Sequence, residues 1–304
     1  MDIFIRNRSY TGPLQAVILD WAGTAIDYGC MGPIAPFIEV FSSCDVAVTA
    51  AEARAPMGLA KKDHLRAMFR DSSVAQKWHD VHGFFPDEGE VEVLYRDLEP
   101  LMVSAVARHC EPIRGLFDAV KAFRRRGLKI GSTTGYTRPM MDVLIPAARE
   151  RGFEPDCVVC SSDVPAGRPY PWMCYRNAID LGVYPLEAMV KIGDTISDIE
   201  EGLNAGMWTI GVAMTGNELG LREEEAISLE PADLSARLTD IKCRFLGAGA
   251  HFVANGIGQC AELIDEINAL LRDAVTPSSF NRPLEMYANR GPNGHGDRVG
   301  QVQR

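Results

Sequence analysis

Residues 16–30 read AVILDWAGTAIDYGC, and this stretch decides the fold. The apolar run Ala16–Leu19 predicts a strand that is buried on both faces. Asp20 follows at the point where that strand ends. Because open α/β sheets bind ligands at the carboxyl ends of their strands, Asp20 is the first candidate site residue.

Similar apolar runs recur along the chain, with helical patterns between most of them. One such pattern runs from Leu116 to Phe123 and ends at Gly127. Strand–helix alternation with fully apolar strands predicts an α/β fold, a doubly wound parallel sheet (Rossmann-like) covered on both faces. The expected strands are Ala16–Leu19, Leu128–Gly131, Cys157–Cys160, Met189–Gly193, Trp208–Val212 and His251–Val253.

The segment between the first two expected strands breaks this alternation. It lacks a convincing strand, carries several prolines, and shows a helical face formed by Val91, Leu94, Tyr95 and Leu98. We therefore expect a helical cap domain at 31–110, inserted after the first strand, and a catalytic core made of 1–30 and 111–272. Such an insertion lands over the carboxyl ends of the strands, where it can act as a lid.

Composition narrows the classes of function. The chain has 304 residues, 46% of them hydrophobic, and a net charge of -10. This balance favours a soluble globular protein and argues against nucleic-acid partners, which need a basic face. The first ten residues have no apolar core of signal-peptide length, and no run approaches the length of a membrane span, so we expect no membrane partner.

Two further features fit a cytoplasmic protein. The eight cysteines are scattered, and the close pair in CVVC (157–160) sits in an expected strand, without a second pair at zinc-ligand spacing. We expect reduced thiols and a cytoplasmic location.

The segment 273–304 is rich in Gly, Pro, Asn and Arg and poor in apolar residues, which predicts a disordered tail.

Four motifs fall at the ends of expected strands, so folding should bring them together. They are Asp20 in DWAGT, the hydroxyl-rich GSTTGYT (131–137), Arg168 in PAGRPYPW, and GDTISD with Asp194 and Asp198. GSTTGYT leads to a helix N-terminus, which favours phosphate. Carboxylates facing a phosphate site suit Mg²⁺, a cation that prefers oxygen ligands.

In this order the four motifs resemble the haloacid dehalogenase superfamily of phosphoryl-transfer enzymes. The resemblance implies that Asp20 attacks phosphorus and forms an aspartyl-phosphate. A second aspartate two positions later usually protonates the leaving oxygen of a phosphate ester, but here that position is Ala22. Either the phosphatase chemistry is impaired, or the leaving group needs no proton from that position.

The cap segment contains a lysine pair at the start of a helical pattern, in PMGLAKKDH. Lys61 aligns with the apolar Leu65 and Met68, whereas Lys62 lies on a more solvated row. A lysine against apolar surroundings loses part of its preference for the charged form and becomes an amine nucleophile. The alternative is an amphipathic lysine whose stem covers apolar surface while its ammonium reaches water.

The longer motifs DWAGT, PMGLAKKDH and PAGRPYPWMCY resemble the phosphonatase family of this superfamily, over about residues 14–270. The resemblance implies that Lys61 forms a Schiff base with the aldehyde of phosphonoacetaldehyde. It further implies phosphoryl binding by Thr134 and Arg168, and Mg²⁺ binding by Asp20, the carbonyl of Ala22 and Asp194, with support from Asp198. The residues implied around the Lys61 end are His64, Met57, Cys30 and Tyr136.

The implied reaction explains Ala22. Electrons of the breaking P–C bond flow into the iminium on Lys61, so an enamine leaves instead of a carbanion and no acid is needed at that position. The products are acetaldehyde and phosphate, within 2-aminoethylphosphonate degradation, and the family further implies a homodimer. Two alternatives stay open: a capped phosphatase or phosphomutase acting on a small phosphate ester, and a non-catalytic ligand-binding protein.

Overall fold

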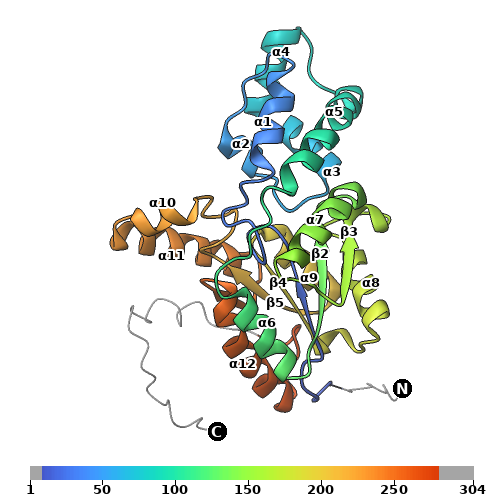
Figure 1. Ribbon diagram of the computed structural model, residues 1–304, viewed down its shortest axis with the longest axis vertical. Helices are drawn as coiled ribbons and strands as arrows, with labels where there is room; N and C mark the ends of the chain where they lie inside the picture. Colours follow the sequence, from blue (N-terminus) through green and yellow to red (C-terminus); the bar gives the residue numbers. More distant parts are fainter. Residues whose placement is uncertain (1–8, 281–304) are drawn as a thin grey trace, which may run out of the picture.

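The core of the molecule is a six-stranded parallel sheet. The computed structural model describes residues 9–280, and its strands pair in the order β3-β2-β1-β4-β5-β6 (Figure 1). This confirms the expected α/β fold class. The strands are β1 (Ala16–Leu19), β2 (Lys129–Thr134), β3 (Cys157–Cys160), β4 (Met189–Gly193), β5 (Trp208–Val212) and β6 (Phe252–Ala254).

The central strand β1 contributes side chains to two apolar cores, one on each face of the sheet. Its side chains alternate, so Val17 and Leu19 join the larger apolar cluster while Ala16 and Ile18 join a second one. In register, Leu19 stands beside Ser132 of β2 and Ile192 of β4. The residues that follow these three strands therefore emerge side by side at one edge of the sheet.

Helices cover both faces of the sheet, as fully buried parallel strands require. The larger cluster takes in α6 (Leu116–Arg125), α7 (Arg138–Glu150) and α12 (Cys260–Arg272), and the second takes in α8 (Trp172–Leu181). The helix α9 (Ile196–Ala205) packs on β4 and β5. The remaining short helices are η1 (Ser161–Asp163), η2 (Leu186–Ala188), η3 (Ile257–Gln259) and α10 (Glu223–Ser228), and α11 (Pro231–Gly247) packs on β6.

Six helices lie between β1 and β2 in the chain, and the first five of them stand over the carboxyl ends of the strands (Figure 1). We call these five the cap. Their own core is aromatic, with Phe69 and Trp78 rings 5.0 Å apart and Phe41 against both. The cap helices are α1 (Ile34–Ser42), α2 (Ala50–Arg54), α3 (Lys61–Arg70), α4 (Ser72–His82) and α5 (Glu88–Val106).

The end of the described chain differs from the expected tail at 273–304. Residues 281–304 lie outside the described residues, but residues 273–280 pack on the core. Phe280 stacks on Phe252 with ring centroids 5.4 Å apart, and the carbonyl of Pro277 lies 3.0 Å from Nε2 of His251. The segment is polar on average, but its aromatic residue Phe280 packs on the core. The prediction of a disordered tail was therefore wrong for residues 273–280.

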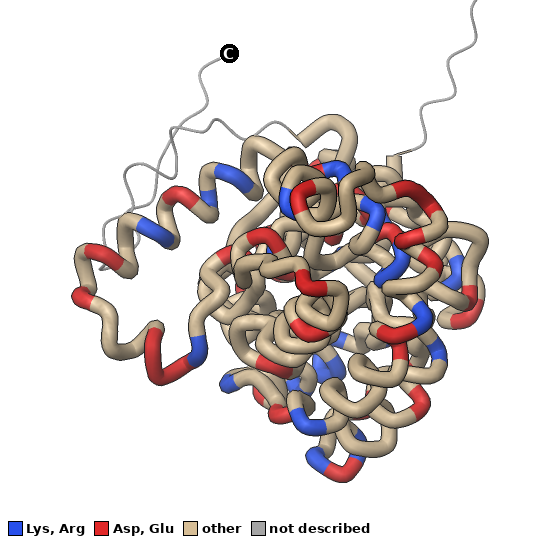
Figure 2. The backbone as a smooth tube through the Cα atoms, turned by 90° about the horizontal axis from the view of Figure 1, so that it is seen from above, with Lys and Arg blue, Asp and Glu red and all other residues tan. Residues whose placement is uncertain are grey.

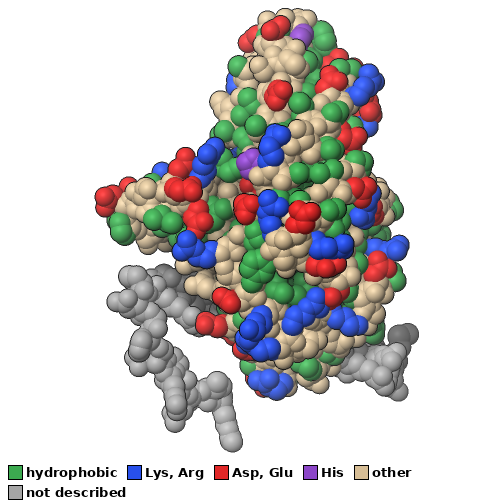
Figure 3. Space-filling view, viewed as in Figure 1, with side chains coloured by type: hydrophobic (Ala, Val, Ile, Leu, Met, Phe, Trp, Pro, Cys, Tyr) green, Lys and Arg blue, Asp and Glu red, His purple; other side chains and the backbone are tan. Residues whose placement is uncertain are grey.

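On the face that Figure 3 shows, and along the backbone seen from above in Figure 2, Lys and Arg are interspersed with Asp and Glu. The α10–α11 pair projects to one side of the core (Figure 1). Within residues 9–280, no helix combines the length and the apolar character that crossing a bilayer requires.

Candidate active site

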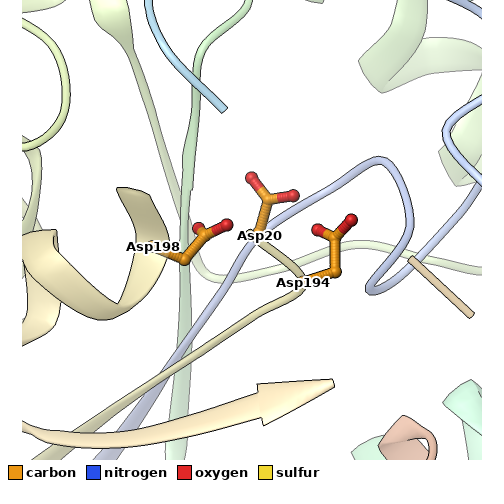
Figure 4. A group of neighbouring side chains, drawn as sticks. All are labelled: Asp20, Asp194 and Asp198. Atoms are coloured by element: carbon orange, nitrogen blue, oxygen red, sulfur yellow. The ribbon is translucent and has the colours of Figure 1, made fainter. Parts of the chain in front are cut away.

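Three aspartates meet beneath the cap, at the edge where β1 and β4 end. Asp20 follows β1, Asp194 follows β4, and Asp198 lies in the first turn of α9 (Figure 4). All three are buried, and one carboxylate oxygen from each lies within 4.8 Å of the others. The structure thus brings together the three acids expected from the sequence.

The electrostatics of this cluster fit a bound cation. Burial raises the pKa of Asp20, and the charge of Asp198 raises it further. Burial and the nearby Asp20 raise the pKa of Asp194 well above its usual range. Two carboxyl groups that hinder each other's ionisation need a nearby cation to be ionised together. A hard oxygen donor set of this kind fits Mg²⁺.

Asp198 is placed to support the site. Its Oδ1 accepts from Lys191 Nζ at 2.7 Å, and its Oδ2 accepts from Thr195 Oγ1 at 2.6 Å. Burial opposes its ionisation, but Arg168 and Lys191 outweigh burial and lower its pKa. With both oxygens engaged, Asp198 holds the strand end and helix start together.

Asp194 is held by two loops. Its Oδ1 accepts from Thr24 Oγ1 at 3.2 Å, and its Oδ2 accepts from the backbone N–H of Asn217 at 2.7 Å. Gly23, with φ of 82°, passes so close that a Cβ there would lie 2.3 Å from Oδ2. The loop after β1 therefore needs glycine at this position.

That same loop supplies Ala22 and Cys30. Ala22 lines the cavity above Asp20, so no carboxyl group stands two residues after the first aspartate. Cys30 also lines it, and its Sγ lies 3.2 Å from Asp194 Oδ2. Burial raises the pKa of the Cys30 thiol well above its usual value, so the thiol stays protonated.

Arg168 is almost fully buried and donates toward the first aspartate. Its Nη2 lies 2.6 Å from Asp20 Oδ1 and 3.0 Å from Asp198 Oδ1. Its Nη1 reaches the cap, 3.3 Å from the carbonyl of Gly58. Thr134 ends β2 and lines the same cavity. A guanidinium and a hydroxyl beside a strand-end aspartate form a suitable phosphoryl-binding pair.

Lys61 begins α3 and extends from the cap into this cavity. It is 3% exposed, and its Nζ lies 4.9 Å from the ring centroid of Tyr136 and 5.8 Å from that of Phe37. Burial lowers its pKa to about 8. Lys62, in contrast, is partly exposed and pairs with Glu92. The two lysines therefore differ as the helical pattern predicts.

The other residues expected near Lys61 fall into two groups. Met57 and Tyr136 line the cavity. His64 does not: it stacks on Phe37 with centroids 3.8 Å apart, and its Nε2 lies 2.9 Å from the carbonyl of Ala53. Burial lowers the pKa of His64 well below its usual value. It is a neutral residue of the cap core behind Lys61.

Some residues of the site were missed by the sequence reasoning. Lys191, inside the apolar run MVKIG (189–193), could have been found from the sequence, because a charge buried in a strand needs a partner and so indicates an acidic residue nearby. The acidic residue one helical turn after Asp198 is a second signal. Asn217, on a loop after β5, carries no local signal. The missed residues are Thr133, Lys191, Glu201, Asn217 and Gly58.

The chain also resembles known proteins. A model of haloacid dehalogenase-like hydrolases matches residues 14–206. A phosphonoacetaldehyde hydrolase of Syntrophobacter fumaroxidans is 58% identical over 91% of this chain and 100% of its own. One of Bacillus anthracis is 46% identical over 84% and 96%.

Among solved structures, a phosphonoacetaldehyde hydrolase like protein from Oleispira antarctica superposes with a TM-score of 0.88 at 36% identity. The match covers 91% of this chain and 100% of that one. The aspartates beneath the cap and the matches in sequence and structure lead to one assignment. The chain belongs to the haloacid dehalogenase-like hydrolases and, among them, to the family of the phosphonoacetaldehyde hydrolases.

Proposed function

We propose that this protein hydrolyses the P–C bond of phosphonoacetaldehyde to acetaldehyde and phosphate. The observation that carries the proposal is a buried lysine with a lowered pKa in the same cavity as a strand-end aspartate paired with an arginine. The amine of Lys61 can condense with an aldehyde, and the carboxylate of Asp20 can accept a phosphoryl group.

In the first step the neutral amine of Lys61 attacks the aldehyde carbon, and water leaves to give an iminium. Cys30 and Tyr136 stay protonated at neutral pH, because burial raises the pKa of both. Both side chains are then neutral beside the Lys61 end of the cavity, and the Cys30 thiol donates to Asp194. Met57 contributes an apolar wall.

In the second step an oxygen of Asp20 attacks phosphorus while Arg168 and Thr134 hold the phosphoryl oxygens. Electrons of the P–C bond move into the iminium and give an enamine on Lys61. Asp20 Oδ1 already accepts from Arg168, and Oδ2 accepts no hydrogen bond from residues 9–280, so Oδ2 is the oxygen we assign to the attack. Water then cleaves the aspartyl-phosphate, and the enamine takes up a proton and is hydrolysed to acetaldehyde.

The residues that would hold Mg²⁺ are Asp20, Asp194 and the carbonyl of Ala22, with Asp198 as support. When bound, the ion neutralises charge between the carboxylates and the phosphoryl group. The fit rests on the buried oxygen cluster and on the raised pKa of two of its members.

Three further features complete the proposal. We place the protein in the cytoplasm, in the degradation of 2-aminoethylphosphonate, and as a homodimer that associates through the cap. Free cysteines throughout residues 9–280 support a reducing location. Exposed apolar residues on the cap, Val81, Phe84, Phe85 and Val93, support association there.

The deciding experiment combines phosphate release from phosphonoacetaldehyde with borohydride trapping. Wild type with Mg²⁺ should release phosphate and be inactivated by borohydride plus substrate, with the adduct on Lys61. Asp20→Asn should keep the adduct and lose phosphate release. Lys61→Arg should lose both, because a guanidinium does not form an imine here. An adduct on Lys62, or none, would overturn the Schiff-base assignment.

The alternative is a capped phosphatase or phosphomutase acting on a small phosphate ester. Lys61 would then remain charged and bind the substrate without forming an imine. Good turnover of sugar phosphates by wild type, with no trapping at Lys61, would favour this alternative. The absence of an acid at position 22 speaks against it.

A further inference from the structure

Glu201 is a buried carboxylate behind the site, one helical turn after Asp198 on α9. It lines no cavity beside the substrate position, so it does not touch the reacting atoms. Its Oε2 accepts from Arg168 Nε and from Thr133 Oγ1, both at 2.9 Å. Its Oε1 is buried and has no hydrogen-bond partner among the described residues.

The side chain of Glu201 contacts Arg168 and two residues that lie beside it, Thr133 and Lys191. Thr133 bridges Glu201 and Arg168, because its Oγ1 also accepts from Arg168 Nη2 at 3.0 Å. Lys191 Nζ stands 3.7 Å from the same Oε2 and 2.7 Å from Asp198. Burying a charge is costly unless it is paired, and the partners that offset the burial of Glu201 are Arg168 and the two residues beside it.

Arg168 is held at all three nitrogens of its guanidinium. Nη2 donates to Asp20 and to the carbonyl of Thr133, and Nη1 reaches the carbonyl of Gly58 at 3.3 Å. The contact of Nε with Glu201, at 2.9 Å, is the one that holds the inner end of the group with a carboxylate, so it contributes to fixing the guanidinium plane. That plane determines where the remaining N–H groups point when a phosphoryl group lies beside Asp20.

We infer that Glu201 is a positioning residue for phosphoryl transfer, which sets the plane of Arg168 through Nε and through Thr133. The inference rests on the proposed function, because it concerns the step at Asp20. It predicts that Glu201 affects P–C cleavage but not the condensation of the aldehyde with Lys61, because the side chain of Glu201 contacts Arg168, Thr133 and Lys191 and not Lys61.

The test compares Glu201→Gln with the matched control Glu200→Gln, the same change at the exposed neighbouring residue of α9. Borohydride trapping with phosphonoacetaldehyde counts the sites that still form the imine. Per trapped site, the Glu201 variant should release phosphate about 10- to 100-fold more slowly, the range for losing a hydrogen bond to a charged group. The control should match wild type.

Inorganic phosphate provides a readout that a merely structural role would not move. Removing a buried negative charge strengthens anion binding if charge alone matters, whereas a misaligned Arg168 weakens it. We expect phosphate to bind several-fold more weakly to Glu201→Gln. Tighter phosphate binding with unchanged cleavage per trapped site would overturn the inference.

Thr133→Val covers the case in which the first variant does not fold. It keeps both charges and removes only the bridging hydroxyl, so cleavage per trapped site should fall by a smaller factor in the same direction. Unchanged cleavage in this folded variant would count against the inference. If wild type itself neither traps nor cleaves, the proposed function fails, which is a separate outcome.

Discussion

At the scale of single residues, Lys61 trades stability for reactivity. It begins α3, where the helix dipole also disfavours a positive charge, and it is buried among aromatic rings. The native state therefore holds an amine that ionises less readily than in water. Both consequences of this, for reactivity and for stability, can be measured.

The first consequence is a pH dependence of imine formation. Only the neutral amine attacks an aldehyde, and burial lowers the pKa of Lys61 to about 8. The rate of borohydride inactivation in the presence of substrate should therefore rise with pH, with a midpoint near 8. A midpoint near 10, the value of a solvated lysine, would contradict the assigned environment.

The second consequence is that Lys61→Met should stabilise the protein while abolishing cleavage. Because the folded-state pKa lies below the unfolded one, protonated Lys61 destabilises the fold below about pH 8, and the cost disappears as pH rises toward 10.5. We expect about 3 kcal/mol of stabilisation at pH 7 and about half of that at pH 9.5. Thermal unfolding at the two pH values measures it, and an equal gain at both would argue against a titration effect.

At the scale of elements, the cap meets the core through glycines. A Cβ on Gly135, after β2, would lie 2.5 Å from the carbonyl oxygen of Leu59 in the cap, and one on Gly58 would lie 2.2 Å from Ser197 Oγ. Arg168 also reaches the carbonyl of Gly58. The segment before α3 thus fits tightly between two core loops, which brings Lys61 to Asp20.

We therefore expect Gly135→Ala to reduce kcat/KM at least about 10-fold by holding the cap away from the core. Gly135 has no left-handed φ, so the effect is not backbone strain. The matched control is Gly247→Ala, at the end of α11, where an added Cβ meets nothing within 4 Å. Wild-type kinetics in the Gly135 variant would show that the cap can tolerate the extra methyl group.

The sequence predicts some elements better than others. The strands β1, β3, β4 and β5 begin and end where their apolar runs do, because a strand buried on both faces needs such a run. Asp20 and Asp194 follow as neighbours from the parallel order. Helical spacing puts His64 beside Lys61, where the structure has it, but that spacing cannot show that the ring stacks on Phe37 in the cap core and does not line the cavity.

At the scale of the whole molecule, the site and an aromatic cluster lie at opposite ends of the sheet. The site lies at the carboxyl ends of the strands. Trp208 and Phe252 begin β5 and β6 at the other end, and Phe280 lies against both, 5.6 and 5.4 Å away between ring centroids. This aromatic cluster ties the last described residues to the core.

Phe280→Ala should therefore lower stability without affecting catalysis. Truncating a half-buried aromatic ring leaves a gap in the cluster, and we expect a loss of about 2 kcal/mol. The kcat at 25 °C should stay at the wild-type value, in contrast to Lys61→Met, which gains stability and loses activity. Thermal unfolding and phosphate release on the same samples make the comparison. A parallel fall in kcat would mean that the two ends of the sheet are coupled, so the aromatic cluster would have a role in shaping the site.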